Sequence, residues 1–164
     1  MREIHERVYV ANELSCTSGN PELAVVHACK SPCHQTAVGY KGNLNKTHPY
    51  YLVLEKSNDL YLNIIDPSLP LFMPPLFSHF LKFSKTKWDN GQKLLIHCNQ
   101  GESRAPSLAL LFLSKGLSVI DKSSYESARK QFEILYPQYK PGRGIEMYFT
   151  TNWENLGNAV TDGG

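Results

Sequence analysis

One segment of the chain, from Leu94 to Pro106, constrains the fold more than any other part of the sequence. It begins with the apolar run Leu94-Leu-Ile-His97, which follows the turn signal Asp89-Asn90-Gly91 and is typical of a buried strand. Pro106 suits the first turn of a helix, and the apolar residues after it extend that helix to Leu113. A strand joined to a helix by a short loop predicts an α/β architecture.

The loop between this strand and this helix has the composition of an anion-binding ring. Cys98 and Arg104 bracket the residues Asn99, Gln100, Gly101, Glu102 and Ser103. Gly101 permits the backbone angles of a tight ring in which amide N–H groups point inward. The helix that follows adds the positive end of its dipole. We therefore expect the loop amides and Arg104 to bind an oxyanion such as phosphate.

The same environment favours the thiolate form of Cys98. A thiolate here is a nucleophile for the phosphorus of a bound phosphate ester, and the planar guanidinium of Arg104 matches two of the ester oxygens. Taken singly, a cysteine is more often a small core residue, and an arginine at a helix start is more often an exposed cation. The agreement of the strand, glycine, proline and helix signals favours the chemical interpretation.

The residues His97-Cys-Asn-Gln-Gly-Glu-Ser-Arg104 resemble the signature HCxxGxxR of the cysteine-dependent protein tyrosine phosphatases, specifically of the small dual-specificity branch. This resemblance implies a general-acid aspartate about thirty residues ahead of the cysteine, a spacing that Asp66 matches. Asp66 follows the strand-like run Leu60–Ile65 and is the only acid between Asp59 and Asp89. The alternative for Asp66 is a turn residue in an Asp-Pro pair.

The resemblance implies hydrolysis of a phosphomonoester through a phosphocysteine intermediate. Cys98 would attack phosphorus, Asp66 would protonate the leaving oxygen and later activate water, and Arg104 with the loop amides would bind the equatorial oxygens. His97 would orient the loop by hydrogen bonding. No metal or other cofactor is expected, because the amides and Arg104 supply the positive charge. The expected substrate is a phosphorylated protein or a small aryl phosphate.

Two residues depart from the pattern of that family. Ala105 stands where most relatives have a Ser or Thr whose hydroxyl stabilises the departing thiolate, so slow hydrolysis of the intermediate is expected. Glu102 adds negative charge to the loop, which disfavours polyanionic substrates such as inositol phospholipids. A phosphate-binding pseudophosphatase and an RNA 5′-triphosphatase remain alternatives. Sulfur transferases and arsenate reductases also use a cysteine in an oxyanion loop, but Gly101 and Asp66 fit them less well.

The rest of the chain predicts one α/β domain over residues 1–157, a mixed twisted sheet flanked by helices as in dual-specificity phosphatases, with a flexible tail at 158–164. Strands are expected at Arg7–Ala11 and Leu23–His27, and a hairpin at Tyr50–Glu55 and Leu60–Ile65. Apolar residues at helical spacing predict helices around Leu76–Phe83, after the capping box Ser123–Glu126, and from Ile145 to Leu156.

Composition limits the class of protein further. A chain of 164 residues with 41% hydrophobic content can bury one sizeable core. A net charge of only +2 does not suggest a nucleic-acid-binding surface. The charged start Met1–Arg7 is unlike a secretory signal, and no apolar run has the length of a membrane span. Since an active thiol also favours a reducing compartment, a cytoplasmic monomer without nucleic-acid or membrane partners is expected.

A second group of chemically active side chains, His27, Cys29, Cys33 and His34, lies outside the signature. Its spacing is tighter than that of usual zinc sites, whose ligands come in well-separated pairs. A thiol of this group could instead form a disulfide with oxidised Cys98, as in some redox-regulated phosphatases. Buried thiols without a chemical role are the simplest interpretation.

Overall fold

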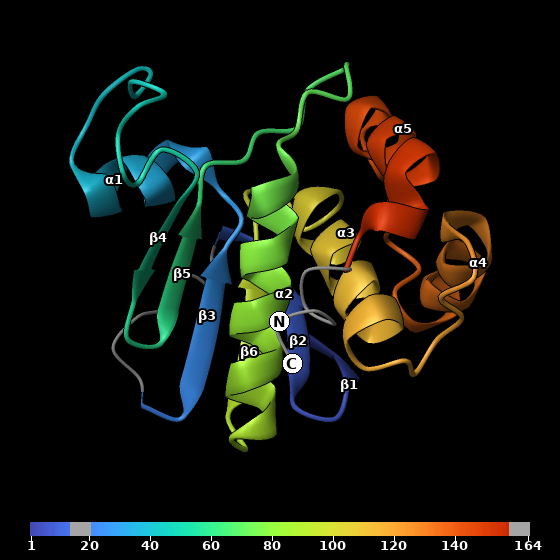
Figure 1. The fold of residues 1–164 in the computed structure, drawn as a ribbon. Coiled ribbons are helices and arrows are strands. Elements are labelled where there is room, and N and C mark those ends of the chain that lie inside the picture. The colour runs from blue at the N-terminus through green and yellow to red at the C-terminus, as the bar shows by residue number, and fades with distance from the viewer. Residues whose placement is uncertain (14–20, 158–164) are drawn as a thin grey trace.

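Six strands form one sheet in the order β1-β2-β6-β3-β5-β4 (Figure 1). The computed structural model describes residues 1–13 and 21–157. Within these ranges the strands are β1 (Arg2–His5), β2 (Val8–Ala11), β3 (Leu23–His27), β4 (Val53–Lys56), β5 (Asp59–Leu62) and β6 (Lys93–His97). The expected strands and the hairpin are confirmed, although the hairpin strands β4 and β5 are shorter than predicted. The sequence pattern did not predict β1, because it is an edge strand in which only Ile4 is buried.

The four inner strands, β2, β6, β3 and β5, run parallel, and the edge strands β1 and β4 pair antiparallel with their neighbours. The sheet is therefore mixed, as expected. Because the inner strands share one direction, their carboxyl ends meet at one edge of the sheet, where α/β proteins bind ligands. β6 lies between β2 and β3, so Cys98 emerges near the middle of that edge.

The longer helices are α2 (Pro74–Asp89), α3 (Arg104–Leu111), α4 (Tyr125–Leu135) and α5 (Arg143–Asn152). A π-helical turn at Lys30–His34 leads into the short α1 (Gln35–Val38), a second π-helical turn at Phe112–Gly116 extends α3, and a 3-10 turn at Trp153–Asn155 follows α5. The helix of the signature segment and the three other predicted helices are thus confirmed.

The predicted start of α4 is wrong by one residue. The cap is Ser124, whose Oγ accepts a hydrogen bond from the Ser127 N–H at 3.1 Å. The N–H of Ser123 instead donates to the carboxylate of Asp121 at 2.8 Å. Two neighbouring serines are equivalent in a sequence pattern, and the preceding turn selects the second of them.

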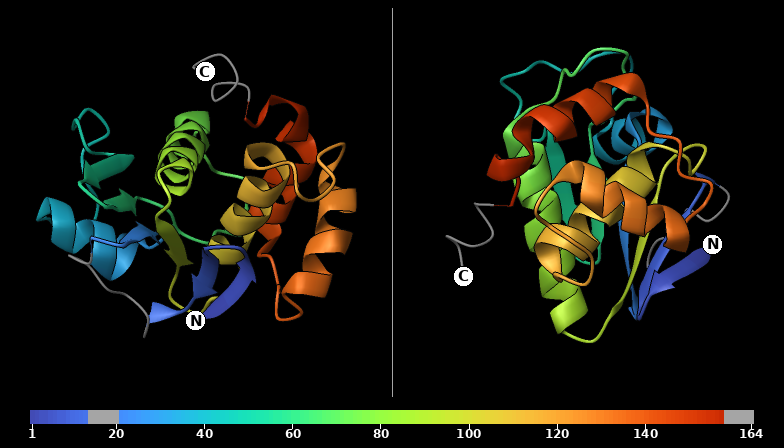
Figure 2. Two further views of the ribbon diagram at one scale, coloured as in Figure 1. Left: turned by 90° about the horizontal axis from the view of Figure 1, so that it is seen from below. Right: turned by 90° about the vertical axis from the view of Figure 1, so that its right-hand side faces the viewer.

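Helices α2, α3, α4 and α5 gather on one face of the sheet, where they form the main core (Figure 2). Alternate strand residues such as Val26, Leu94 and Ile96 face these helices and are buried. The helices contribute Phe80, Phe112, Phe132 and Phe149, none of which is exposed. Burial of each such side chain stabilises the fold by roughly 2–3 kcal/mol. A smaller apolar group, Ala11, Val25 and Leu95, occupies the other face.

The predicted flexible tail at residues 158–164 lies outside the described residues. Among the residues that are described, no helix is both long enough and apolar enough to cross a membrane.

Candidate active site

Cys98 follows β6 directly and lies at the base of the predicted ring. Its side chain is buried, and the Gly101 N–H donates a hydrogen bond to its Sγ at 3.2 Å. Gly101 has a φ of 74°. A Cβ at this position would also lie within 3.2 Å of the Ala11 carbonyl oxygen at the end of β2. Glycine is therefore required here twice, for its backbone angle and for the close approach of two chain segments.

The carbonyl groups of the ring are held on its outer side. The Tyr136 hydroxyl donates to the Gly101 carbonyl at 2.7 Å, and the Lys140 N–H donates to the Glu102 carbonyl at 2.8 Å. In a trans peptide the C=O of one residue and the N–H of the next point in opposite directions. The N–H groups of Glu102 and Ser103 are therefore directed to the inner side of the ring, where an oxyanion would accept them.

Arg104 is the first residue of α3, and its guanidinium is held in place by two other segments. Nη2 donates to Oδ1 of Asn99 at 2.6 Å, and Nη1 donates to the Ile64 carbonyl at 3.2 Å. Asn99 in turn donates from Nδ2 to the Ser31 carbonyl at 3.1 Å. A guanidinium has five N–H donors, so these two bonds leave three for a ligand.

Asp66 lies on the exposed loop that follows β5, two residues after the Ile64 that contacts Arg104. Its carboxylate packs against Gly142 so closely that a Cβ at position 142 would overlap it. The Gly142 N–H donates to Oγ of Ser103 at 2.7 Å. Gly142 thus touches both the ring and the predicted general acid, and the structure brings Asp66 to the edge that carries Cys98.

The segment Pro141–Gly144 was not assigned a role from the sequence, yet it joins the two loops. The Gly144 N–H donates to the Pro67 carbonyl at 3.1 Å, and a Cβ at Gly144 would overlap the carbonyls of Pro67 and Leu69. The two glycines just before a predicted helix were the signal for a close approach of backbone. Their partner, the Asp66 loop, is distant in the sequence and could not be identified from it.

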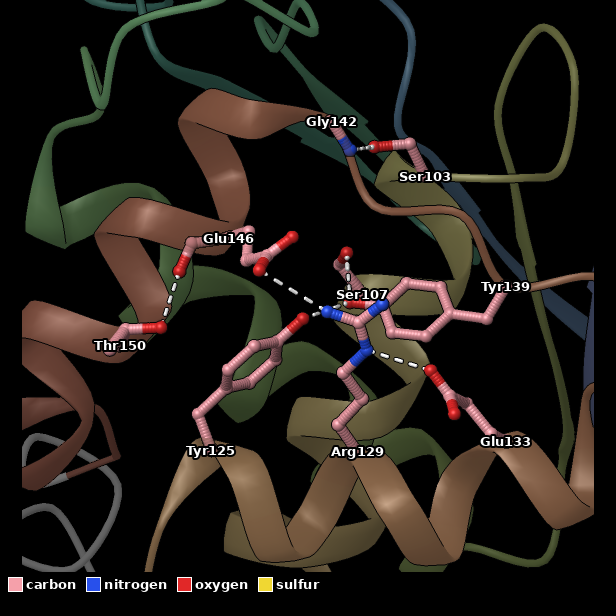
Figure 3. A network of polar contacts seen from close by, with 9 residues as sticks. All are labelled: Ser103, Ser107, Tyr125, Arg129, Glu133, Tyr139, Gly142, Glu146 and Thr150. Atoms are coloured by element: carbon pink, nitrogen blue, oxygen red, sulfur yellow. Dashed lines mark hydrogen bonds and ion pairs between the residues drawn. The ribbon is translucent and has the colours of Figure 1, made fainter.

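A network of polar contacts behind the ring fixes the segment that carries Gly142 (Figure 3). The Tyr139 hydroxyl lies 2.8 Å from Oγ of Ser107 on α3 and 2.9 Å from the hydroxyl of Tyr125 on α4. Burial raises the pKa of Tyr139 well above 10.0, so its phenol stays protonated and available as a donor. Arg129 on α4 completes the network through ion pairs with Glu133 and Glu146 at 2.7 and 3.3 Å.

His97 is the last residue of β6, directly before Cys98, and its imidazole contacts a second histidine. Its Nε2 lies 2.8 Å from Nδ1 of His27, and Nε2 of His27 lies 2.8 Å from Oδ1 of Asp59. Burial, followed by the neighbouring His27, lowers the pKa of His97 to about 4. Burial also lowers the pKa of His27, although Asp59 opposes this effect. Both imidazoles are therefore neutral near pH 7, which fits the predicted positioning role of His97.

The four side chains of the second group do not come together as one ligand set. The two ring nitrogens of His34 contact the Tyr40 hydroxyl at 2.6 Å and the Tyr50 carbonyl at 2.8 Å, so His34 is engaged away from His27, Cys29 and Cys33. This agrees with the sequence analysis, in which the tight spacing of the group argued against a zinc site formed by these four residues.

Cys29 lies beside the ring. Its Sγ lies 2.8 Å from the Ser31 carbonyl oxygen and 3.3 Å from Oδ1 of Asn99, and its single S–H can donate to one of them at a time. A hydrogen bond with Cys33 and the nearby guanidinium of Arg104 lower the pKa of Cys29 to about 6, against the effect of burial. Cys29, in the segment after β3, is therefore a second ionisable thiol next to Asn99, the residue that positions Arg104.

Comparisons with known proteins support the fold and no more. No family model and no curated protein sequence matches the chain. Human tyrosine phosphatase-like serine/threonine/tyrosine-interacting protein aligns with a TM-score of 0.65 and 17% identity over 95% of this chain and 96% of that one. Human DUSP28 aligns with a TM-score of 0.62 and 11% identity over 100% of both chains.

A third solved structure, a mouse dual specificity phosphatase complexed with zinc tungstate, aligns with a TM-score of 0.61 and 13% identity over 96% of this chain and 89% of that one. Identities this low establish the fold alone. The fold implied by the signature resemblance is confirmed: the chain has the α/β fold of the small dual-specificity branch of the cysteine-dependent phosphatases.

Proposed function

We propose that the protein is a cysteine-dependent phosphatase that hydrolyses phosphomonoesters of proteins or small aryl groups through a phosphocysteine. The observation that carries this proposal is the hydrogen bond from the Gly101 N–H to Sγ of Cys98 at 3.2 Å, inside a ring whose carbonyls are held outward. A ring of this kind stabilises both a sulfur anion and the oxygens of a bound phosphate.

In the first step the Cys98 thiolate attacks phosphorus and a P–S bond forms while the bond from phosphorus to the leaving oxygen breaks. Asp66 gives its proton to that oxygen. The amides of Glu102 and Ser103, with the remaining N–H groups of Arg104, bind the three equatorial oxygens. The protein carries all the charges that this step requires, because the guanidinium offsets the negative charge of the phosphoryl group.

In the second step Asp66, now a carboxylate, takes a proton from water as the water oxygen attacks phosphorus. The P–S bond breaks and sulfur leaves as a thiolate, which the Gly101 N–H stabilises. Ala105 offers no hydroxyl for this purpose. Of the nearby hydroxyls, Ser107 Oγ contacts the Tyr139 hydroxyl, and Ser103 Oγ accepts from the Gly142 N–H. We therefore propose that hydrolysis of the phosphocysteine limits turnover.

The test is hydrolysis of para-nitrophenyl phosphate and of phenyl phosphate by the wild type and by three variants. Cys98→Ser and Arg104→Lys are expected to lose activity with both substrates. Asp66→Asn is expected to lose far more with phenyl phosphate, because the poorer leaving group depends on the proton. Asp89→Asn, at the end of α2, serves as the control outside the ring. Full activity in Cys98→Ser would exclude the proposal.

A phosphate-binding protein without turnover is the second candidate, and the buried Ala105 is the observation that favours it. One solved structure with this fold is named as phosphatase-like and as an interacting protein. Binding of a phosphotyrosine peptide by the wild type, with no phosphate released and no phosphocysteine trapped by acid quenching, would favour this candidate. Phosphate release that depends on Cys98 would exclude it.

We propose residues 1–157 as the catalytic domain and a reducing compartment, the cytoplasm, as its location. The reason is chemical, because an oxidised Cys98 cannot attack phosphorus. Loss of activity in hydrogen peroxide, with recovery in dithiothreitol, is the expected result.

A further inference from the structure

The second face of the sheet carries a pair of histidines that the proposed reaction does not use directly as acid or base. His27 ends β3 and His97 ends β6, and these two residues are direct partners in the parallel register of the two strands. Side chains at paired positions of neighbouring strands project from the same face. The fold thus places two imidazoles side by side, with Nδ1 of His27 2.8 Å from Nε2 of His97.

The ring of His27 is held in one orientation by contacts on two sides. Its Nε2 donates to Oδ1 of the buried Asp59 at 2.8 Å, and its face stacks on Tyr61 with ring centroids 4.3 Å apart. A neutral imidazole that donates from Nε2 has its lone pair on Nδ1. A carboxylate behind a histidine in this way is the arrangement that orients histidine ligands of metal ions.

A sulfur completes the cluster. The ligand atoms of His27, His97 and Cys33 all lie within 4.8 Å of one another. Cys33 comes from the π-helical turn Lys30–His34, so the three donors belong to three separate segments. Two imidazole nitrogens and a thiolate are the donor set that Zn²⁺ prefers. In tetrahedral zinc the two nitrogens would be about 3.3 Å apart, so the histidine pair has to open by roughly half an ångström.

The hydrogen bonds of His97 are incomplete. Its Nδ1 is buried and has no hydrogen-bond partner among the residues that the structure describes. A buried polar atom without a partner is costly, and such atoms are rare in native proteins. Coordination through Nε2 would move the imidazole proton to Nδ1. The Cys33 thiol would lose its proton to solvent on binding.

We propose that His27, His97 and Cys33 form a zinc site that ties the Lys30–His34 turn to the carboxyl ends of β3 and β6. The site lies behind the ring rather than in it, and it does not depend on the proposed function. The three side chains leave the fourth coordination position to water. Since Ser31 in the same turn accepts from Asn99, a bound ion would also steady the side chain that positions Arg104.

The probe is Co²⁺, which replaces Zn²⁺ in such sites and is coloured. The full chain is treated with chelator, dialysed and titrated with Co²⁺ under anaerobic conditions. The wild type is expected to bind one Co²⁺ with a thiolate-to-cobalt charge-transfer band, which excess Zn²⁺ abolishes. Zinc is also expected to raise the Tm. The variant Cys33→Ser is expected to lose both the band and the rise in Tm, while circular dichroism reports that it is folded.

A second cysteine variant locates the ion. Cys98→Ser removes the thiol of the ring and is the matched control, because Cys98 is not a proposed ligand. It is expected to keep the band. The proposal is overturned if the wild type shows no charge-transfer band, if the band survives in Cys33→Ser, or if it disappears in Cys98→Ser.

Discussion

Oδ1 of Asn99 accepts a hydrogen bond from Nη2 of Arg104 at 2.6 Å, so the residue after the proposed nucleophile positions the proposed phosphate-binding residue. Asn99 is itself anchored through Nδ2 to the Ser31 carbonyl. The sequence suggested only that the Asn99 main chain contributes to the ring. The structure adds a role for its side chain, which links Arg104 to the segment that follows β3.

Loss of this side chain is expected to weaken catalysis without unfolding the protein. A hydrogen bond to a charged group contributes about 1.5–3 kcal/mol, so Asn99→Ala should reduce kcat/KM for an aryl phosphate by roughly 10-fold to 100-fold. Gln100→Ala changes the next, exposed residue of the ring and is the control. Equal kinetics in the two variants would contradict the positioning role.

Gly142→Ala tests the placement of Asp66. The added methyl group would overlap the Asp66 carboxylate, so the acid must move. We expect kcat to fall strongly with phenyl phosphate and little with dinitrophenyl phosphate, whose leaving group needs no proton. Kinetics with both substrates on one enzyme preparation provide the internal control. A uniform loss with the two substrates would mean that Gly142 shapes the ring rather than the acid.

Ala105→Ser tests the slow step of the proposed reaction. A hydroxyl at this buried position next to the ring would stabilise the departing thiolate, so kcat at saturating substrate should rise several-fold and the initial burst of phenol should shrink. Ser107→Ala lacks a different hydroxyl, one that contacts Tyr139, and should leave the burst unchanged. An unaltered or lower kcat in Ala105→Ser would count against rate-limiting hydrolysis.

Tyr139→Phe tests the network behind the ring. This change removes the hydroxyl shared by Ser107 and Tyr125, and it leaves both of those groups without a partner at that position. Each lost buried hydrogen bond costs about 1 kcal/mol, so we expect the free energy of unfolding in urea to fall by about 2 kcal/mol. Tyr50→Phe, at a half-exposed side chain, is the matched control and should change it little.

The stability of the fold should depend on pH through His97. Folding lowers the pKa of His97 from 6.5 to about 4, so the unfolded chain binds more protons between these values. The contribution of His97 is therefore complete above pH 6.5 and is lost as the pH falls toward 4. The titration of His97 alone should make the free energy of unfolding about 2 kcal/mol lower at pH 5 than at pH 7.

Urea unfolding of the chelator-treated, metal-free protein at the two pH values measures this difference. His97→Gln should reduce the difference, whereas His79→Gln, at an exposed position on α2, should preserve it. An identical pH dependence in the wild type and His97→Gln would show that other groups are responsible.

Local interactions explain why the ring could be predicted from the sequence. Cys98, Gly101 and Arg104 lie in one short segment, and a strand, a loop and a helix start impose their relative positions on each other within a few residues. Short apolar runs likewise predicted β2, β3 and β6, since these inner strands are buried at nearly every position. The likeness to a known signature supplied Asp66.

Contacts between distant segments could not be predicted in this way, because they depend on the order of the strands. The sequence placed Gly142 in an unassigned break, and only folding brings it between Ser103 and Asp66. The sequence grouped His34 with Cys33, whereas the parallel pairing of β3 with β6 gives Cys33 the neighbours His27 and His97. Sequence by itself determined which residues form the ring, and the tertiary structure decided which remote residues surround it, because strand register is a property of the whole sheet.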